Sequence, residues 1–225
     1  MKMKKTIAVV VILVVIAGFL SAIEIKNSTF FGGVSFDYIT ANGRRYDTSQ
    51  PITSTVAGLS VYGGYDVQFG NRWYTRLEYE YLLLPTHFTV ADIDVPADAD
   101  LRRTASKKRV GGYVVLGKAD SDIKFNLGGV ITNVTMGILH NKAFEFNYVQ
   151  DLVGVGLILE GVYVFNKHFT ARFGIVPDLT FITIDRAEFG VMEDDDTYIK
   201  QTKTRTAIFT MGFSISARAG ITYKF

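Results

Sequence analysis

The sequence predicts an all-β fold, a closed antiparallel barrel of eight strands. The first reason is the segment from Ala207 to Phe225, where apolar side chains occupy the odd positions and mostly small or polar ones the even positions. Successive side chains of a strand point to opposite faces, so a period of two predicts a strand with one apolar face. Seven earlier segments alternate in a similar way, and the connections between the segments are alternately short and long.

The N-terminal residues 1–22 have the pattern of a secretory signal peptide. Lysines precede an uncharged run from Thr6 to Leu20, which small Ser21 and Ala22 follow. As a helix this run would span only ~22 Å, less than a hydrocarbon core of ~30 Å. We therefore expect cleavage after Ala22, with cleavage at a nearby position or an uncleaved anchor as the alternatives.

Residues 23–225 are expected to form one transmembrane β-barrel domain, because neither a linker nor a break in composition divides them. No later run approaches eighteen apolar residues, so a membrane-spanning helix is not expected there. The chain has no cysteine, and an exported protein without disulfides must be held together by its sheet and its core.

The expected strands follow one another along the whole of this domain. They are residues 28–41, 54–69, 72–85, 109–118, 123–137, 151–165, 169–184 and 204–225. Short turns are expected at residues 69–73, 118–122 and 165–169, and longer polar loops at residues 42–53, 86–108, 139–150 and 185–203. Val130, Val134 and Met136 fall on a face that should be polar, which leaves open a β-bulge or a partly apolar interior.

A soluble β-sandwich also alternates, so the apolar face needs a second argument. The segments are several times longer than the ~5–6 residues usual in soluble sheets. Aromatic residues cluster beside the short turns, as in the girdle of a membrane barrel. The expected girdle consists of Trp73, Tyr74, Phe165 and Phe169. We therefore expect the apolar face to meet lipid and both termini to lie on the periplasmic side.

The export signal, the eight segments and the ending Gly220-Ile221-Thr222-Tyr223-Lys224-Phe225 resemble the small eight-stranded bacterial outer-membrane proteins of the OmpX, OmpA-barrel and OmpW types. In those families a last strand with alternating hydrophobics and a terminal aromatic is read by the outer-membrane assembly machinery. The matching positions are Ile221, Tyr223 and Phe225. The resemblance implies location in the bacterial outer membrane, a monomer, and outer-membrane lipids and the assembly machinery as partners.

The face opposite the lipid gathers charged side chains. Eight strands leave an interior just wide enough for side chains to fill, and opposite charges there should pair because an unpaired buried charge is costly. The expected lumen charge network is Asp37, Asp66, Arg76, Glu78, Glu80, Lys124, Glu160, Arg172, Asp178 and Arg218. We expect a side-chain plug in a structural or interaction protein whose external loops could meet a ligand or a host surface. The alternatives are a narrow or gated polar path, or an OmpW-like passage for small hydrophobic molecules.

Nucleic acid is not an expected partner. Residues 1–22 hold three lysines and no acid, so the 24 Lys and Arg against 22 Asp and Glu become 21 against 22 in the mature chain. No net positive field then remains to attract phosphates.

We expect neither catalysis nor a bound metal or cofactor. The three histidines, His87, His140 and His168, show no short-range spacing with serine and an acid that suggests a triad. The alternating aspartates of residues 92–100 lack the glycine and the terminal glutamate of an EF-hand loop. The basic cluster of residues 102–109 is expected at the outer interface, near lipid phosphates.

Overall fold

The computed structural model describes residues 25–44, 51–69, 71–90, 93–94, 101–118, 120–140, 146–193 and 197–224. The expected signal peptide lies outside them. Within them no helix is long and apolar enough to cross a membrane. The strands are β1 (Ile25–Arg44), β2 (Pro51–Phe69), β3 (Trp73–Val90), β4 (Ile93–Asp94), β5 (Leu101–Leu116), β6 (Ile123–His140), β7 (Phe146–Val164), β8 (Phe169–Glu193) and β9 (Thr197–Lys224).

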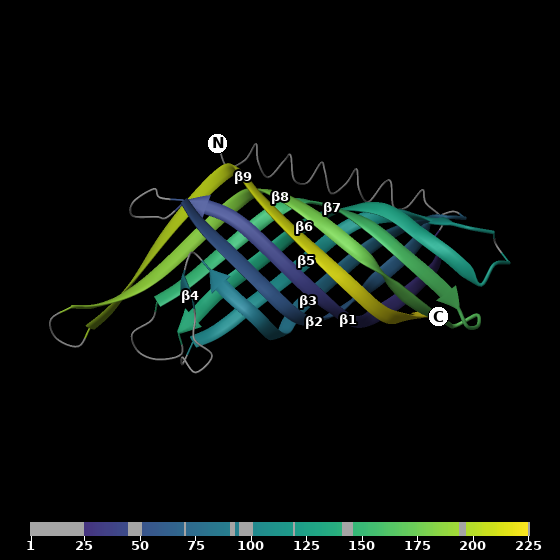
Figure 1. The fold of residues 1–225 in the computed structure, drawn as a ribbon, viewed down its shortest axis with the longest axis horizontal. Helices are drawn as coiled ribbons and strands as arrows, with labels where there is room; N and C mark the ends of the chain where they lie inside the picture. The colour runs from purple at the N-terminus through teal and green to yellow at the C-terminus, as the bar shows by residue number, and fades with distance from the viewer. Residues whose placement is uncertain are drawn as a thin grey trace.

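The predicted eight-stranded antiparallel barrel is confirmed in the described residues. Eight strands follow the order β2-β1-β9-β8-β7-β6-β5-β3, and a pairing between β2 and β3 closes the ring (Figure 1). The two-residue β4 only extends one edge of β3. Stepping from partner to partner around the ring leads from Thr29 back to β1 at Ile39, ten residues further on. Such a stagger tilts the strands against the barrel axis, as closure requires.

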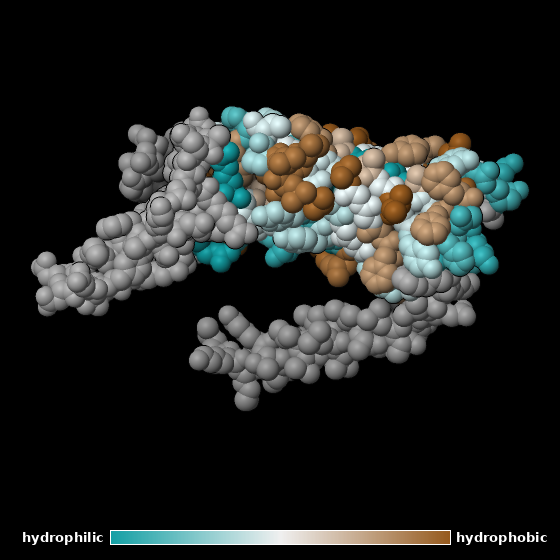
Figure 2. All heavy atoms as spheres, turned by 90° about the horizontal axis from the view of Figure 1, so that it is seen from below, coloured by the Kyte–Doolittle hydropathy of each residue, from teal (hydrophilic) through white to brown (hydrophobic). Residues whose placement is uncertain are grey.

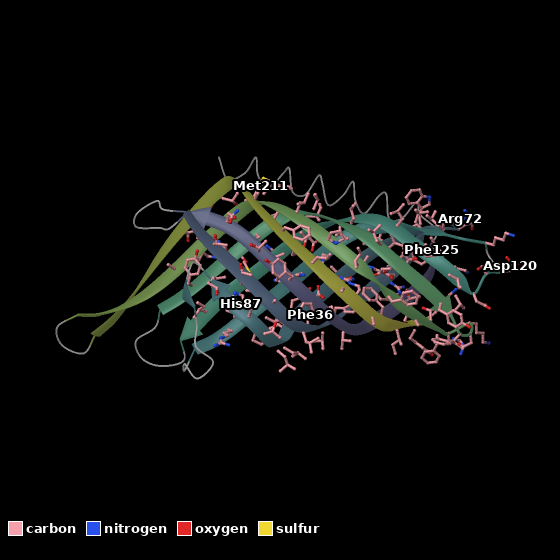
Figure 3. All side chains as sticks on the ribbon, in the orientation of Figure 1. Phe36, Arg72, His87, Asp120, Phe125 and Met211 are labelled. Carbon is pink, nitrogen blue, oxygen red and sulfur yellow. The ribbon has the colours of Figure 1, made fainter. Side chains whose placement is uncertain are left out.

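The barrel is apolar outside and polar inside. Along β3, Leu77 and Tyr79 are 60% and 48% exposed, whereas the intervening Glu78 is 3% exposed. Figure 2 shows hydrophobic side chains spread over the outer wall, and in Figure 3 Phe36 and Phe125 project from that wall. A soluble protein buries its apolar face, so this inverted arrangement needs an apolar surrounding.

Of the two alternatives left open for Val130, Val134 and Met136, the structure shows a partly apolar interior and no bulge in β6. The pairings of β6 with β5 and with β7 run without a register shift. Val130, Val134 and Met136 therefore keep their inward parity, and all three are buried. Val130 packs with Tyr113 and Ile158.

Several strands are longer than expected. The prediction of a loop at residues 86–108 is wrong for most of this range, which belongs to strands. β3 continues to Val90 and β5 already begins at Leu101, because the two strands flanking this connection keep their sheet partners beyond the expected ends. The expected loop of residues 185–203 is also mostly wrong, because β8 and β9 pair as far as Glu193 and Thr197. They form a long hairpin that extends beyond the rest of the barrel (Figure 1).

The filled lumen as the candidate functional site

The lumen contains two adjoining layers of side chains, an ionic and an apolar one. The ionic layer consists of Asp37, Asp66, Arg76, Glu78, Glu80, Lys107, Arg109, Glu160, Arg172, Asp178 and Arg218. β3 contributes Arg76, Glu78 and Glu80 at successive inward positions, since every second residue of a strand faces the lumen. Each member of the layer is less than a tenth exposed.

Two arginines on the adjacent strands β3 and β5 hold the middle of the ionic layer. Nε of Arg76 donates to Asp66 Oδ1 at 3.0 Å, and its two terminal nitrogens lie 2.7 and 2.9 Å from the oxygens of Glu160. Arg109 donates to Glu78 at 2.7 Å and contacts further carboxylates on β3 and β8. Guanidinium groups suit such a position because their donors form a planar fork that matches carboxylates.

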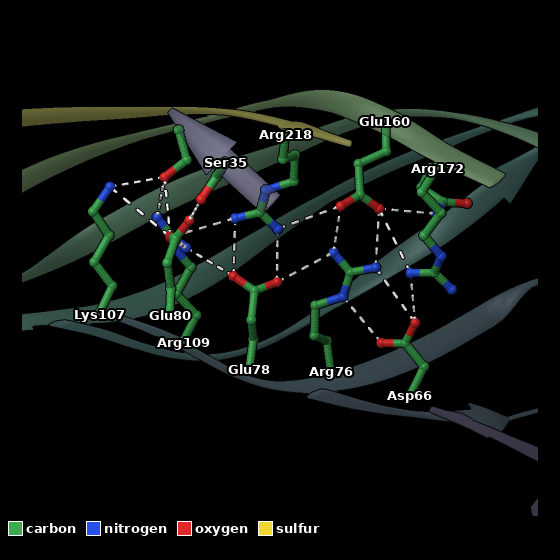
Figure 4. Close-up of polar contacts among 12 residues, drawn as sticks. Ser35, Asp66, Arg76, Glu78, Glu80, Lys107, Arg109, Glu160, Arg172 and Arg218 are labelled. Atoms are coloured by element: carbon green, nitrogen blue, oxygen red, sulfur yellow. Dashed lines mark hydrogen bonds and ion pairs between the residues drawn. The ribbon is translucent and has the colours of Figure 1, made fainter. Parts of the chain in front are cut away.

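The remaining cations extend this network in both directions. Arg218 binds Glu78 with both terminal nitrogens, at 2.7 and 2.9 Å. Lys107 Nζ lies 2.6 Å from Asp37 Oδ1, and Arg172 Nη1 lies 2.8 Å from an oxygen of Asp66. Figure 4 shows cations and carboxylates following one another along the lumen.

The charges in the ionic layer nearly cancel. It contains five cationic and six acidic side chains, and each takes part in at least one ion pair. Aromatic rings add to the packing, because the Arg76 guanidinium lies 4.6 Å from the ring centre of Phe31 and that of Arg218 lies 4.7 Å from Tyr62. Pairing of this kind offsets part of the cost of taking charges out of water.

The apolar layer lies next to the ionic layer on the long-loop side. Its members are Ile39, Ala41, Val56, Leu82, Phe88, Val90, Ala105, Val134, Met136, Ile138, Tyr148, Leu152 and Ala187. A cavity of about 10 Å³ lies where the two layers meet, between Asp37, Leu82 and Lys107 among others. This volume is enough for roughly one water molecule, so the layers adjoin closely.

The structure places nine of the ten residues of the expected charge network in the ionic layer. The tenth, Lys124, is half-buried and lines a cavity nearer the short-turn end. Lys107 and Arg109 were missed, since the basic cluster containing them was expected at the outer interface. In β5 the apolar Val110 and Leu116 show that the even positions face outward. The odd positions, and with them Lys107 and Arg109, could therefore have been predicted to face the lumen.

The expected aromatic girdle needs one correction. Trp73, Phe165 and Phe169 are exposed on the outer wall beside the short turns. Tyr74 instead faces the lumen, with its ring stacked on Tyr113 at 5.0 Å. It follows Trp73 directly in a strand, and so it must point to the opposite face.

The C-terminal strand places the expected assembly signal on the outer wall. Ile221 and Tyr223 are 60% and 39% exposed there. Phe225 lies outside the described residues, as does the side chain of His140. Of the described histidines, His87 contacts the Thr89 hydroxyl at 3.3 Å, and His168 Nδ1 lies 3.1 Å from the backbone oxygen of Lys224.

No protein-family model matches this sequence. No curated protein matches it either. Among solved structures, the chain is similar to the Neisserial surface protein A, with 9% identity, a TM-score of 0.48, and coverage of 88% of this chain and 97% of that one. It is similar to a major outer membrane protein from Thermus thermophilus, with 10% identity, a TM-score of 0.47, and coverage of 85% and 99%. It is also similar to Ail, the attachment invasion locus protein of Yersinia pestis, with 10% identity, a TM-score of 0.44, and coverage of 88% and 98%.

The class of this protein follows from its own geometry. The ring of strands is closed, the outer wall is apolar, and the charged groups are paired inside. Closure is what allows strands to cross hydrocarbon, because every backbone polar group must be satisfied within the protein. The chain is an eight-stranded β-barrel protein of the bacterial outer membrane.

Proposed function

We propose that this protein is a closed, non-conducting barrel with a structural or interaction role in the outer membrane. The observation that supports this role is the ionic layer, whose paired side chains meet across the lumen. An ion entering the lumen would have to replace contacts such as the pair of Arg76 and Glu160 at 2.7 Å. The apolar layer beyond it adds a second obstacle, because all of its side chains except that of Tyr148 are apolar and cannot replace the water around an ion.

Planar-bilayer recording tests this proposal directly. The purified, refolded protein is inserted into a bilayer beside an open porin that serves as the positive control. We expect silence across many insertions, with insertion verified independently by protease protection. Reproducible single-channel steps from the wild-type chain contradict the closed-barrel proposal.

The apolar layer supports a second candidate, an OmpW-like passage for small hydrophobic molecules. Its thirteen members line the outer part of the lumen, where a hydrophobic molecule would enter from the cell surface. Binding of an environment-sensitive apolar dye to the refolded protein distinguishes the two candidates. If the dye binds saturably and Met136→Lys abolishes this binding, the result favours the passage. If Met136→Lys leaves dye binding unchanged, the result favours the plug.

We also propose that the protein has no catalytic role, although the barrel fold by itself does not decide this. Of the two described histidine side chains, neither hydrogen-bonds a serine hydroxyl or a carboxylate. An enzyme acting on outer-membrane lipid would alter lipid A when the protein is expressed. Mass spectrometry of the extracted lipid should give an unchanged profile, and new lipid A species would contradict this proposal.

Outer-membrane lipids and the assembly machinery are the partners we propose for the outer wall. Ile221, Tyr223 and Phe225 are proposed to form the signal for assembly. The variant Tyr223→Ala/Phe225→Ala should refold in detergent like the wild type but fail to assemble in cells. An equal defect in both settings would indicate that the change acts on stability alone.

We further propose that the barrel is a monomer and that its external loops meet a ligand or a host surface.

A further inference from the structure

A cavity of about 280 Å³ lies at the periplasmic end of the lumen, beneath the ionic layer. Its cationic side chains come from three strands and one short turn: Lys124, Lys167, Arg172 and Lys224. His168 of the same turn also lines it. None of the fifteen lining residues is an aspartate or a glutamate. A neighbouring cavity of about 520 Å³ shares Lys124 and Lys224, adds Arg72 and Lys118, and likewise has no acidic lining residue.

Buried polar groups without partners lie in the wall of the smaller cavity. The hydroxyls of Thr29 and Thr222 and Nε of Arg172 have no hydrogen-bond partner among the described residues. These three side chains are 6%, 3% and 6% exposed. An unpaired buried donor costs about 1–3 kcal/mol. A ligand that accepts hydrogen bonds from these three groups would remove that cost, which favours its binding.

The acidic groups near this end do not line the cavity, although Asp66 pairs with Arg172 of its wall. Asp66 is engaged by Arg76 at 3.0 Å and by Arg172 at 2.8 Å. Asp120 and Asp122 are exposed in the turn between β5 and β6, and neither lines the cavity. Figure 3 places Asp120 with Arg72 at the short-turn end of the barrel. The three lysines of the lining, Lys124, Lys167 and Lys224, face no carboxylate among the other lining residues, and such an excess of positive charge raises the local concentration of anions.

We propose that this periplasmic cavity binds a single phosphoryl group. A phosphoryl group carries up to two negative charges and several acceptor oxygens, which suits a site with hydroxyl donors and several cations. The cavity is too small for a polymer but has room for a phosphate with a short substituent. The source is either the headgroup of a lipid in the periplasmic leaflet or a soluble phosphate ester. This site is independent of whether the lumen conducts.

The first test uses the refolded full-length mature chain in nanodiscs of phosphatidylcholine, with glycerol phosphate as the probe. Calorimetry at low ionic strength should give saturable binding to one site. Thr29→Val/Thr222→Val removes both hydroxyls at nearly constant volume and should weaken binding at least ~10-fold, because the lost partners are hydrogen-bond donors. Lys167→Gln lies in an exposed turn, so it should weaken binding without affecting the fold.

Lys108→Gln is the matched control, because Lys108 is exposed on the outer wall and far from the cavity lining. It should leave glycerol phosphate binding unchanged. Heat-modifiable gel migration verifies folding of each variant. The proposal is overturned if the wild type shows no saturable binding, or if Lys108→Gln weakens binding as much as the cavity variants.

A second arm distinguishes the two sources of the phosphoryl group. The titration is repeated in nanodiscs that contain phosphatidylglycerol. The apparent affinity for glycerol phosphate should be lower there if the headgroup occupies the cavity. Exchanging the phosphatidylglycerol for phosphatidylcholine should then restore it. An unchanged affinity assigns the site to a soluble ester. Both outcomes support a phosphoryl site.

Discussion

Arg76 and Glu160 form a bidentate ion pair across the lumen, with nitrogen to oxygen distances of 2.7 and 2.9 Å. The two residues lie on β3 and β7, which β5 and β6 separate in the sheet. Glu160 also accepts a hydrogen bond from Asn126 at 3.1 Å and lies 3.5 Å from Arg218. Through Arg76 and Arg218 this carboxylate joins β7 to β3 and β9, which are not its neighbours in the sheet.

Replacing Glu160 should destabilise the barrel strongly. Glu160→Gln leaves Arg76 and Arg218 buried with less negative charge beside them, and breaking one side of a buried ion pair costs about 3–5 kcal/mol. The free energy of unfolding, measured by urea titration in micelles, should fall by that amount. Asp120→Asn in an exposed turn is the control and should stay within about 0.5 kcal/mol of the wild type. Equal effects of the two changes would contradict the role given to the pair.

Two glycines on adjacent strands should differ sharply in their tolerance of alanine. A Cβ at Gly156 would lie 2.1 Å from Asp178 Oδ1, whereas at Gly129 the nearest atom would be 3.8 Å away. Asp178 holds Arg109 at 2.8 Å, so Gly156→Ala must displace a carboxylate of the ionic layer. We expect about 1–3 kcal/mol of destabilisation, the usual cost of overpacking.

The variant Gly129→Ala is the matched control for Gly156→Ala. Gly129→Ala should be neutral or slightly stabilising, because glycine loses more conformational freedom on folding than alanine does. Urea titration of both variants under one condition gives the comparison. A Gly156→Ala protein as stable as the Gly129→Ala protein would mean that Asp178 can move at no cost.

The period of two was sufficient to predict the barrel and the inward side of most strands. It predicted Asp66, Glu78 and Asp178 inside because each of their strands has an apolar opposite face. The expected network, however, held six acids and only four cations, an imbalance that buried groups do not tolerate. Lys107 and Arg109 supply the missing charge. Lys107 lies before the expected strand start at residue 109, and Arg109 was assigned with the basic cluster to the outer interface.

Other features of the lumen could not be predicted from one strand at a time. The apolar layer forms because residues such as Ile39, Val56 and Met136 from separate strands reach the same level, which depends on the stagger around the ring. The cavity at the short-turn end depends on the same stagger, which aligns Thr29 with Lys224. Stagger follows from the register of all eight pairings and not from any local pattern.

The single tryptophan of the chain can report the position of the membrane interface at the short-turn end. Trp73 is 65% exposed on the outer wall, directly before the inward-facing Tyr74. Tryptophan prefers the boundary between headgroups and hydrocarbon. Its fluorescence in brominated phosphatidylcholine should be quenched more by bromine near the headgroup than by bromine near the chain end. Equal quenching at all depths, or none, would place Trp73 away from the interface.

Under the closed-barrel proposal the two lumen layers are barriers to ions in series, so removing one of them should not make the barrel conduct. Arg76→Ser/Glu160→Ser removes a neutral pair and leaves the neighbouring charges partnered, since Asp66 keeps Arg172 at 2.8 Å and Arg218 keeps Glu78. Met136→Ala/Leu152→Ala thins the apolar layer. Each double variant should remain silent in planar bilayers, because the untouched layer still blocks ions. The fourfold variant should give small single-channel steps. Steps from the apolar double variant alone would show that the ionic layer is permeable, and the closed-barrel proposal would then lose its main support.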